Sequence, residues 1–588
     1  MVRTTVVGMV FFFAAASAGD FYVAPDGKDD NPGTEQAPFA SLERARDAVC
    51  QLVRGGLQGD IAVFVRGGTY TVEKPLAFGP EDSGTVEYAV TYAAYPGEKP
   101  VISGGRTITG WQKADDGLWR VELPDVKDGR WRFRQLFRDG VRLPRGRFPN
   151  EGTLLTVEKV SADVRDIMLS EPLPVGNLAG RDAELVMYQN WSISREPIVG
   201  SDGKTVRVAT PMGWIGHGDA TTASPGKPAY VENVVEFVDQ PGEWCLDRRT
   251  GVLTYKAEEG EDPNARRFVA PKAEQLIVVR GRAEAPVRNV RFVGLALEHT
   301  EWSLPEFGYL GIQAGHHGTT MKERFHVLPL AIEFVHAEGC ELRACSIAHM
   351  GACGVGFGAG CRYNHVADCE LSDIGGNGIM VGWRGSGEGG ALAGDESLSA
   401  DWNDPAHVPI GIEVVGNVVR ACGAVNHGCV GIFDAFSADT KIVHNLVTDM
   451  PYTGISVGFR WDESPTSQRG CLVEYNHIHD VMKMLADGGG IYTLGLQPGT
   501  VLRGNLIYDV HRSAFAYGGA PNNGIFFDQG SKGFLVEGNV IYNTSGDPIR
   551  FNQTVKENFL WKDNAFGIAP GAPGFPEQVA SQAGPPPR

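Results

Sequence analysis

The chain has 588 residues, of which 42% are hydrophobic and 21% charged, a composition typical of a globular protein with a large core or two domains. Its 71 acidic and 53 basic residues give a net charge of −18, which argues against a nucleic-acid partner and favours a neutral or weakly charged substrate. The 77 glycines follow no collagen-like period, so they indicate many tight turns and close backbone packing.

The first 18 residues have the pattern of a secretory signal peptide. Arg3 supplies the positive start, residues 6–16 form a short apolar run, and Ala16-Ser17-Ala18 provides a small-residue cleavage site. The apolar run is too short to span a membrane, and no later segment reaches about 18 apolar residues. We therefore expect an exported protein, periplasmic or extracellular, that is cleaved near Ala18 and makes no membrane contact.

Residues 19–110 predict an N-terminal cap followed by the first coils of a solenoid. A short strand is expected at 21–23, and Leu42, Ala45, Ala48 and Val49 recur at helical spacing with charged residues between them. A helix at this position would cover the open end of the solenoid, where apolar core and unpaired strand edges are otherwise exposed. Strand-like runs follow at 61–70, 91–97 and 100–105.

Between residues 111 and 275 the pattern changes to short alternating strands that are often interrupted by proline and glycine. This pattern predicts an inserted antiparallel, β-sandwich-like domain.

Residues 276–567 show a repeat of β character. An asparagine between two apolar pairs recurs at steps of 28 to 34 residues, and cysteines hold the same place in two earlier repeats: Asn417, Asn445, Asn476, Asn505 and Asn539, with Cys345 and Cys369. Such a period predicts stacked coils, so the fold class is all-β, a right-handed parallel β-helix. A buried asparagine column is structural, because each side-chain amide can bond to its neighbours. The Pro/Gly-rich residues 568–588 are expected to be an unstructured tail.

Each repeat also carries a strand that opens with Gly-Ile. Because side chains alternate along a strand, the isoleucine faces inward and the next residue outward. The outward column is then Met380, Phe433, Ser456, Tyr492 and Phe526. Two residues further on, small or apolar residues occupy four repeats and Asp528 occupies the fifth. This pattern predicts a groove with an acid at one end.

Two segments, 302–325 and 383–407, are too long to be simple corners between coils. Both are rich in side chains that could contact a sugar, among them Trp302, His316 and His317. They are candidate substrate-binding loops.

Asp487 and Asp528 are the candidate catalytic pair, since cleavage of a glycosidic bond needs two carboxyl groups. Asp487 precedes three glycines, which we interpret as giving a substrate access to the carboxylate. An Asp-Gly turn without a catalytic role is the alternative. The register offsets the two carboxylates along the groove, which favours an inverting over a retaining outcome.

The remaining candidates are aromatic and histidine side chains near the aspartates. Trp461, Tyr492 and Phe526 could stack on a sugar, and His479 and His511 could bind hydroxyl groups, although plain packing would explain any of them.

Paired cysteine or Cys/His zinc spacing is missing from the sequence, so we expect no metal and no cofactor. The ten cysteines could be buried thiols or form disulfides.

Four strings carry a family resemblance: PYTGISVGFRW (451–461), LADGGGIYTLG (485–495), NNGIFFDQGS (522–531) and DQPGEWCLDRRTGVLTY (239–255). They resemble glycoside hydrolase family 141 along nearly the whole mature chain. The resemblance implies an exported parallel β-helix enzyme with an inserted β-sandwich, active as an α-L-fucosidase or a xylanase on complex polysaccharides. It also implies that Asp487 and Asp528 are the catalytic pair. Cys245 stands where the family usually has tyrosine.

Two other classes remain open from the residues alone. A polysaccharide lyase would need an arginine or lysine base, and Arg460 and Lys483 lie near the groove in sequence. A non-catalytic glycan-binding solenoid would explain the repeats and the aromatic residues, but not the outward Asp528. In each case the partner is a polysaccharide or oligosaccharide. The oligomeric state is not set by the sequence.

Overall fold

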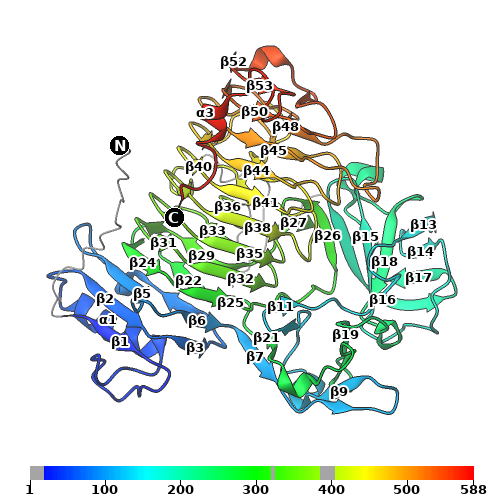
Figure 1. Cartoon of the computed structure of the whole chain (residues 1–588), viewed down its shortest axis with the longest axis horizontal. Coiled ribbons are helices and arrows are strands. Elements are labelled where there is room, and N and C mark those ends of the chain that lie inside the picture. Colours follow the sequence, from blue (N-terminus) through cyan, green and yellow to red (C-terminus); the bar gives the residue numbers. More distant parts are fainter. Residues whose placement is uncertain (1–18, 319–324, 384–403, 588) are drawn as a thin grey trace.

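The computed structural model describes residues 19–318, 325–383 and 404–587 (Figure 1). The signal-peptide prediction for 1–18 and most of the segment 383–407 lie outside the described residues, as does part of 302–325.

Three long parallel sheets form the body of the molecule, and each successive coil adds one strand to each sheet (Figure 1). One coil, for example, runs from β34 (His365–Ala367) in the twelve-stranded sheet through β35 (Glu370–Ile374) in the eleven-stranded sheet to β36 (Ile379–Val381) in the ten-stranded sheet. The prediction of a right-handed parallel β-helix is confirmed.

The ten-stranded sheet is the one that carries the Gly-Ile strands. Its strands are, in order, β4 (Leu76–Phe78), β22 (Ile277–Arg280), β29 (Leu330–Val335), β33 (Cys353–Phe357), β36, β39 (Ile432–Asp434), β42 (Ile455–Val457), β45 (Gly489–Thr493), β48 (Asn523–Phe527) and β51 (Ile549–Phe551). Ile455, Ile491 and Ile525 are register partners and are fully buried in the main core. The next residue along each strand points away from that interior, as the alternation predicts.

An asparagine ladder runs along the corner between the twelve- and eleven-stranded sheets. The side-chain oxygen of Asn476 accepts hydrogen bonds from the backbone and the side-chain amide of Asn445, both at 3.0 Å. Asn476 donates in turn to Asn505 at 3.0 Å, and the pattern continues through Asn539 to Asn564. Cys369 joins the other end, where its backbone N–H donates to Asn417. All ten cysteines of the chain are buried free thiols.

Helix α1 (Leu42–Arg54) caps the N-terminal end of the coils, as expected. Ser41 caps the helix by accepting a hydrogen bond from the backbone of Arg44. Its apolar face, Leu42, Ala45, Ala48 and Val49, is buried in the main core. The helix therefore covers apolar surface that the first coil would expose.

The chain leaves the coils after β6 (Pro100–Ser103) and returns to them at β22. The intervening domain contains six strands whose antiparallel pairings close into a ring: β18 (Pro228–Glu232), β13 (Leu155–Val160), β14 (Asp166–Leu169), β17 (Thr205–Val208), β16 (Ile193–Asp202) and β15 (Glu184–Tyr188). β13 and β16 pass from one face to the other at register shifts, so the two faces of the expected sandwich are joined. Its interior is a separate apolar core.

The candidate loop 302–325 adds strands to this inserted domain. β26 (Tyr309–Gln313) pairs with β16, and β27 (His316–Gly318) pairs with β26. The loop is thus a hairpin that ties the inserted domain to the face of the β-helix.

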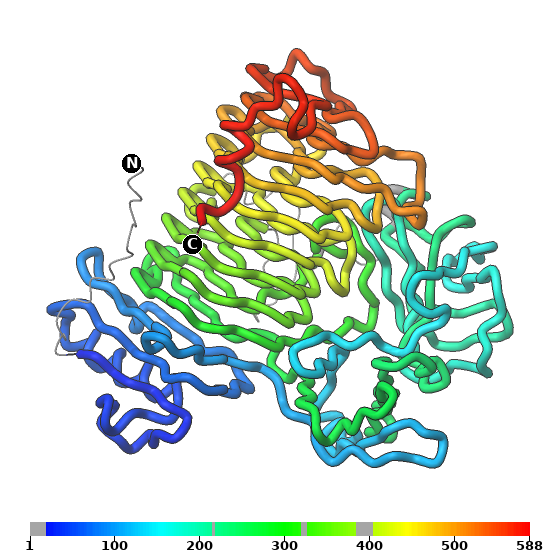
Figure 2. Tube along the Cα trace, in the orientation of Figure 1, coloured from blue at the N-terminus to red at the C-terminus, as the bar shows by residue number. Residues whose placement is uncertain are grey.

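The C-terminal tail is ordered along the flank of the coils, where Figure 2 shows it in red. It contains the short helix α3 (Glu577–Ala580). The backbone of Gly584 donates to the carbonyl of Tyr475 at 2.8 Å, and His444 contacts the carbonyl of Gln582 at 2.9 Å. The expectation of an unstructured tail fails because carbonyls and rings at the coil corners supply partners that composition does not reveal.

Candidate functional site

Asp487 lies in the corner that leads into β45. Its backbone has φ +61°, a left-handed conformation that aspartate tolerates better than most residues. The Tyr452 hydroxyl donates to the Asp487 carbonyl at 3.0 Å, and the preceding backbone N–H of Ala486 donates to Asn190 of the inserted domain at 2.8 Å. The turn is therefore fixed from both domains.

The Asp487 carboxylate is paired with Arg550 of the next-but-one coil. The Arg550 Nη1 lies 2.8 Å from Asp487 Oδ1, and the two side chains are 20% and 21% exposed. The guanidinium also lies over the ring of Phe526, 4.0 Å from its centroid. Arg550 is the register partner of Phe526, so the stacking of coils places it there.

Asp528 follows the end of β48 and is 9% exposed. Both of its oxygens accept hydrogen bonds from neutral donors: the Tyr492 hydroxyl at 2.5 Å and the Asn552 amide at 2.7 Å. Tyr492 is the register partner of Phe526 in the neighbouring strand. Its ring lies edge-on to Phe526, with the centroids 5.2 Å apart.

One outward row of side chains therefore connects the two carboxylates. Asp487 pairs with Arg550, which lies over the ring of Phe526. Tyr492 packs on Phe526 and donates a hydrogen bond to Asp528. Tyr492, Leu494 and Phe526 form an apolar cluster distinct from the coil interior, and Trp461 packs against it while partly exposed. The side chain of Gln313, from the hairpin of the loop 302–325, forms a hydrogen bond with Tyr492. The row is closed on one side by this hairpin. We call this set of residues the carboxylate row: Asp487, Arg550, Phe526, Tyr492 and Asp528, with Leu494, Trp461 and Gln313 packed against them.

Burial is the largest cause of the raised pKa values of Asp487 and Tyr492. Burial raises the pKa of Asp487 above its usual value, although the charge and hydrogen bond of Arg550 oppose it. The charge of Asp528 adds a smaller upward contribution to the pKa of Asp487. Burial and then Asp528 raise the pKa of Tyr492 well above its ordinary value, so this phenol keeps its proton and donates it.

Five of the sequence-predicted residues meet in this row, namely Asp487, Asp528, Tyr492, Phe526 and Trp461. The expectation that Tyr492 and Phe526 present open rings to a sugar is wrong. Tyr492 is 4% and Phe526 0% exposed, because the next coil and the hairpin cover the outward face.

His316 extends the row as a packing residue. Its ring stacks on Phe459 with centroids 4.1 Å apart, and Phe459 lies 4.7 Å from Trp461. His316 is fully buried, so in this structure it cannot reach solvent to bind a hydroxyl group.

His479 and His511 meet around a different residue. His479 Nδ1 lies 2.9 Å from Asp480 and His511 Nε2 lies 3.0 Å from the other oxygen of the same carboxylate. His479 also stacks on Tyr508, with centroids 5.0 Å apart. β44 (His477–His479) belongs to the eleven-stranded sheet, so this pair faces another side of the solenoid.

Trp302 and His317 are packing residues beneath the hairpin. His317 lies 4.9 Å from the ring of Tyr309 and 5.9 Å from Trp302, and each side chain is at most 6% exposed. Burial first, then the neighbouring histidines, hold the pKa of His317 well below its usual value.

Sequence reasoning missed Arg550 and Asn552, and it did not predict the contact of Gln313 with Tyr492. The first two could have been found by carrying the register one coil further, since Ile549 aligns with Ile525. Gln313 lies in the candidate substrate-binding loop 302–325, but its contact with Tyr492 had no signal in the sequence, because its position depends on the hairpin that joins the inserted domain.

The interpretation of the three glycines after Asp487 is also wrong. A Cβ on Gly488 would lie 2.5 Å from Thr453 Oγ1, and one on Gly489 would lie 2.4 Å from the carbonyl oxygen of Asn523. All three glycines are buried between coils. They are needed for coil packing rather than for substrate access.

Among residues 19–318, 325–383 and 404–587, no cluster of three or more His, Cys, Asp or Glu side chains is arranged to hold a metal ion. In the same ranges, no helix has the length and apolar character needed to cross a membrane.

Comparisons with known proteins agree with this architecture. A solved structure described as a glycoside hydrolase superposes with a TM-score of 0.85 at 25% identity, covering 97% of this chain and 99% of that chain. The family model for the GH141 insertion domain matches residues 116–258. The fold and its inserted domain define a parallel β-helix glycoside hydrolase. The chain carries the insertion domain of glycoside hydrolase family 141 at residues 116–258 and is similar to a solved glycoside hydrolase along nearly its whole length.

More distant similarities exist. Pectate lyase PEL9 of Emericella nidulans is 38% identical over 92 residues, which is 16% of this chain. The chain spans only a fifth of the length of that relative. The structure of XylC with xylose is 12% identical with a TM-score of 0.47, covering 94% of this chain and 87% of that chain.

Gly489→Ala tests the packing role of the glycines. We expect it to lower the free energy of unfolding by about 1–3 kcal/mol, because the added methyl group meets a backbone carbonyl that cannot move without shifting β48. Thermal and denaturant unfolding would measure this. Gly519→Ala is the matched control, since a Cβ there has open space. Wild-type stability together with weakened substrate binding in Gly489→Ala would instead restore the substrate-access interpretation.

Proposed function

We propose that the protein is an α-L-fucosidase acting on complex polysaccharides, with Asp487 as general acid and Asp528 as base or nucleophile. The observation that carries the proposal is the carboxylate row, which holds two carboxyl groups in different environments on the outer face of one sheet. Glycoside hydrolysis needs one carboxyl group that donates a proton and another that acts on water or on the anomeric carbon.

The different surroundings of the two carboxyl groups support this division of roles. Burial raises the pKa of Asp487, which favours the protonated form that a general acid requires. Asp528 instead accepts hydrogen bonds at both oxygens, from Tyr492 and Asn552. These donors hold its carboxylate in a fixed orientation. Trp461, the partly exposed aromatic member of the row, is the aromatic side chain best placed to stack on a sugar.

The choice of α-L-fucoside rests on the four family strings, and a xylanase of the same family is the alternative. Because Asp487 and Asp528 stand at opposite ends of the row, inversion of anomeric configuration remains the expected outcome.

Asp487→Asn and Asp528→Asn should each lower kcat on the cleaved glycoside by about 10²–10⁴-fold, since each removes a proton-transfer or nucleophilic group. Activity on an aryl α-L-fucoside and on xylan would measure this, with circular dichroism to verify folding. Asp563→Asn is the control, because Asp563 is an exposed turn residue with the same left-handed backbone. Full activity in either site variant would refute the catalytic assignment.

A polysaccharide lyase is the second candidate, favoured by the local similarity to a pectate lyase. Treatment of pectin with the wild-type protein distinguishes the two classes. An unsaturated product that absorbs in the ultraviolet would establish β-elimination, whereas reducing ends without that absorbance indicate hydrolysis. A wild-type protein that hydrolyses neither fucoside nor xylan would refute the leading proposal.

Arg550→Gln should move the alkaline limb of the kcat/KM profile to higher pH. The positive charge of Arg550 lowers the pKa of Asp487 against the effect of burial. Removing that charge raises the pKa of Asp487, so the general acid stays protonated at higher pH. Arg503→Gln is the control, because Arg503 pairs with Glu474 and Glu537 in the twelve-stranded sheet. An unmoved or lowered limb would contradict Asp487 as the acid.

We also propose that the protein is exported and cleaved after Ala18. N-terminal sequencing of the protein recovered from the periplasm or medium should begin at Gly19. Recovery of an uncleaved chain in the cytoplasm would contradict export.

A further inference from the structure

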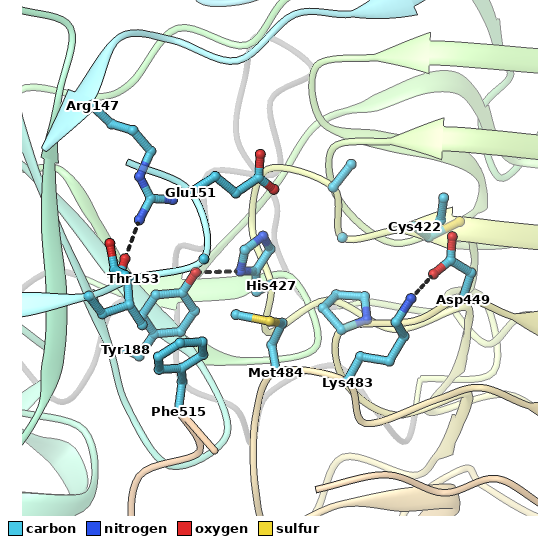
Figure 3. A pocket seen from close by; sticks show the side chains of 16 residues that line it. Arg147, Glu151, Thr153, Tyr188, Cys422, His427, Asp449, Lys483, Met484 and Phe515 are labelled. Carbon is cyan, nitrogen blue, oxygen red and sulfur yellow. Dashed lines mark hydrogen bonds and ion pairs between the residues drawn. The ribbon is translucent and has the colours of Figure 1, made fainter. Parts of the chain in front are cut away.

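A cavity of about 490 Å³ lies between the inserted domain and the corners of four coils (Figure 3). Arg147, Glu151 and Tyr188 line it from the inserted domain, and Asp449, Lys483 and Met484 line it from the coils. This volume falls within the range of about 300–1,000 Å³ found for small-molecule sites. None of the residues of the carboxylate row lines it.

The cavity lies beside the corner that carries Asp487. Met484, in its wall, is three residues from Asp487 along the same corner. Phe515, also in its wall, belongs to the segment that contains Arg512, and Arg512 is close enough to lower the pKa of Asp487. Both wall residues therefore place the cavity next to the segments that surround Asp487.

The lining combines apolar surface with neutral hydrogen-bonding groups. Tyr188, Met484 and Phe515 supply the apolar surface, and the Tyr188 hydroxyl is 3.0 Å from Nδ1 of His427 (Figure 3). Burial first, then the nearby arginines, lower the pKa of His427 to about 4, so its ring is neutral at neutral pH. A neutral imidazole can both donate to and accept from a sugar hydroxyl.

The charged groups of the lining balance one another. Lys483 is paired with Asp449. Arg147 donates to the backbone carbonyls of Pro149 at 2.9 Å and Thr153 at 3.2 Å, and Glu151 brings a compensating negative charge to the same wall. Two cations and two anions leave no net charge to attract a uronate or sulfate group.

We propose that this cavity, which we call the leaving-group cavity, binds a neutral sugar unit on the leaving-group side of the cleaved bond. The side assignment rests on the proposed function, because a general acid stands next to the leaving-group oxygen. The neutral-sugar assignment rests on the lining itself. The cavity would select substrates by the chain to which the cleaved sugar is attached.

Ala424→Trp fills the cavity, because Ala424 is an exposed lining residue. For a neutral fucosylated xyloglucan oligosaccharide, kcat/KM should fall about tenfold or more. For an aryl α-L-fucoside, whose leaving group does not extend into the cavity, kcat/KM should stay within about twofold. Phe515→Ala should act in the same direction by removing an apolar contact. Ala162→Trp, at an exposed turn of the inserted domain away from the cavity, is the matched control.

Equal kcat/KM for the oligosaccharide in the wild type and Ala424→Trp would overturn the proposal. Equal losses on both substrates would also overturn it, since they would show damage to the carboxylate row. If the wild type cleaves no glycoside, the proposed function fails, and calorimetry with the same oligosaccharide still decides the cavity: binding must be present in the wild type and lost in Ala424→Trp. Binding of an oligogalacturonide as tight as that of the neutral probe would refute a neutral-sugar site.

Discussion

The asparagine ladder is the constraint on which the rest of this molecule depends. Each buried amide of the ladder accepts from one neighbouring coil and donates to the other, so Asn445, Asn476 and Asn505 form a chain of hydrogen bonds with a single direction. Slipping one coil by a residue would leave buried amide groups unpaired, at a cost of about 1–3 kcal/mol for each. The ladder therefore fixes the register in which Tyr492, Phe526 and Arg550 stand side by side.

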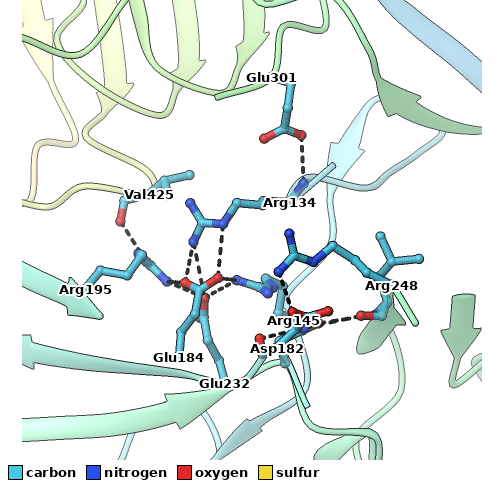
Figure 4. Close-up of polar contacts among 11 residues, drawn as sticks. Arg134, Arg145, Asp182, Glu184, Arg195, Glu232, Arg248, Glu301 and Val425 are labelled. Carbon is cyan, nitrogen blue, oxygen red and sulfur yellow. Dashed lines mark hydrogen bonds and ion pairs between the residues drawn. The ribbon is translucent and has the colours of Figure 1, made fainter. Parts of the chain in front are cut away.

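A second constraint sets the inserted domain against the coils (Figure 4). Three buried arginines, Arg134, Arg145 and Arg195, share the carboxylates of Glu184 and Glu232. The cluster reaches the β-helix directly: Arg195 donates to the carbonyl of Val425 at 3.3 Å, and the backbone of Arg134 donates to Glu301 at 2.7 Å. Charges this deeply buried are stable only when paired, so separating the two domains would expose these charges to solvent or leave them buried without a partner.

The same arginine–glutamate cluster is connected through the chain to the leaving-group cavity and to the hairpin beside the carboxylate row. Val425 is two residues from His427 in the leaving-group cavity, and Arg195 lies on β16, the strand that carries the hairpin with Gln313. The inserted domain thus shapes one wall of the carboxylate row and one wall of the cavity. Under the proposed function, variation in this domain would change which substrate chains fit beside Asp487 without changing the carboxylates themselves.

The sequence predicts those parts of the site that obey the coil period and misses those that depend on a neighbour in space. The Gly-Ile alternation correctly places Asp528 on the outer face, and the asparagine phrase predicts the stacked coils. Arg550 was missed because its strand begins Pro-Ile and lacks the glycine that marked the others. His479 is close to Asp487 in sequence and His511 lies on the next coil, yet the three-sheet coil turns both toward Asp480 on a different side.

The two carboxyl groups have different surroundings. These surroundings, rather than repulsion between the two groups, account for most of the raised pKa of Asp487. Burial is the largest cause of the raised pKa of Asp487, and the charge of Asp528 contributes less. A pair that relied on mutual repulsion would have to stand close together, as two carboxylates that share one proton do. Here the corner before β45 buries one group, while Tyr492 and Asn552 donate to the other. Under the proposed function, the two groups can therefore keep distinct roles without sharing a proton.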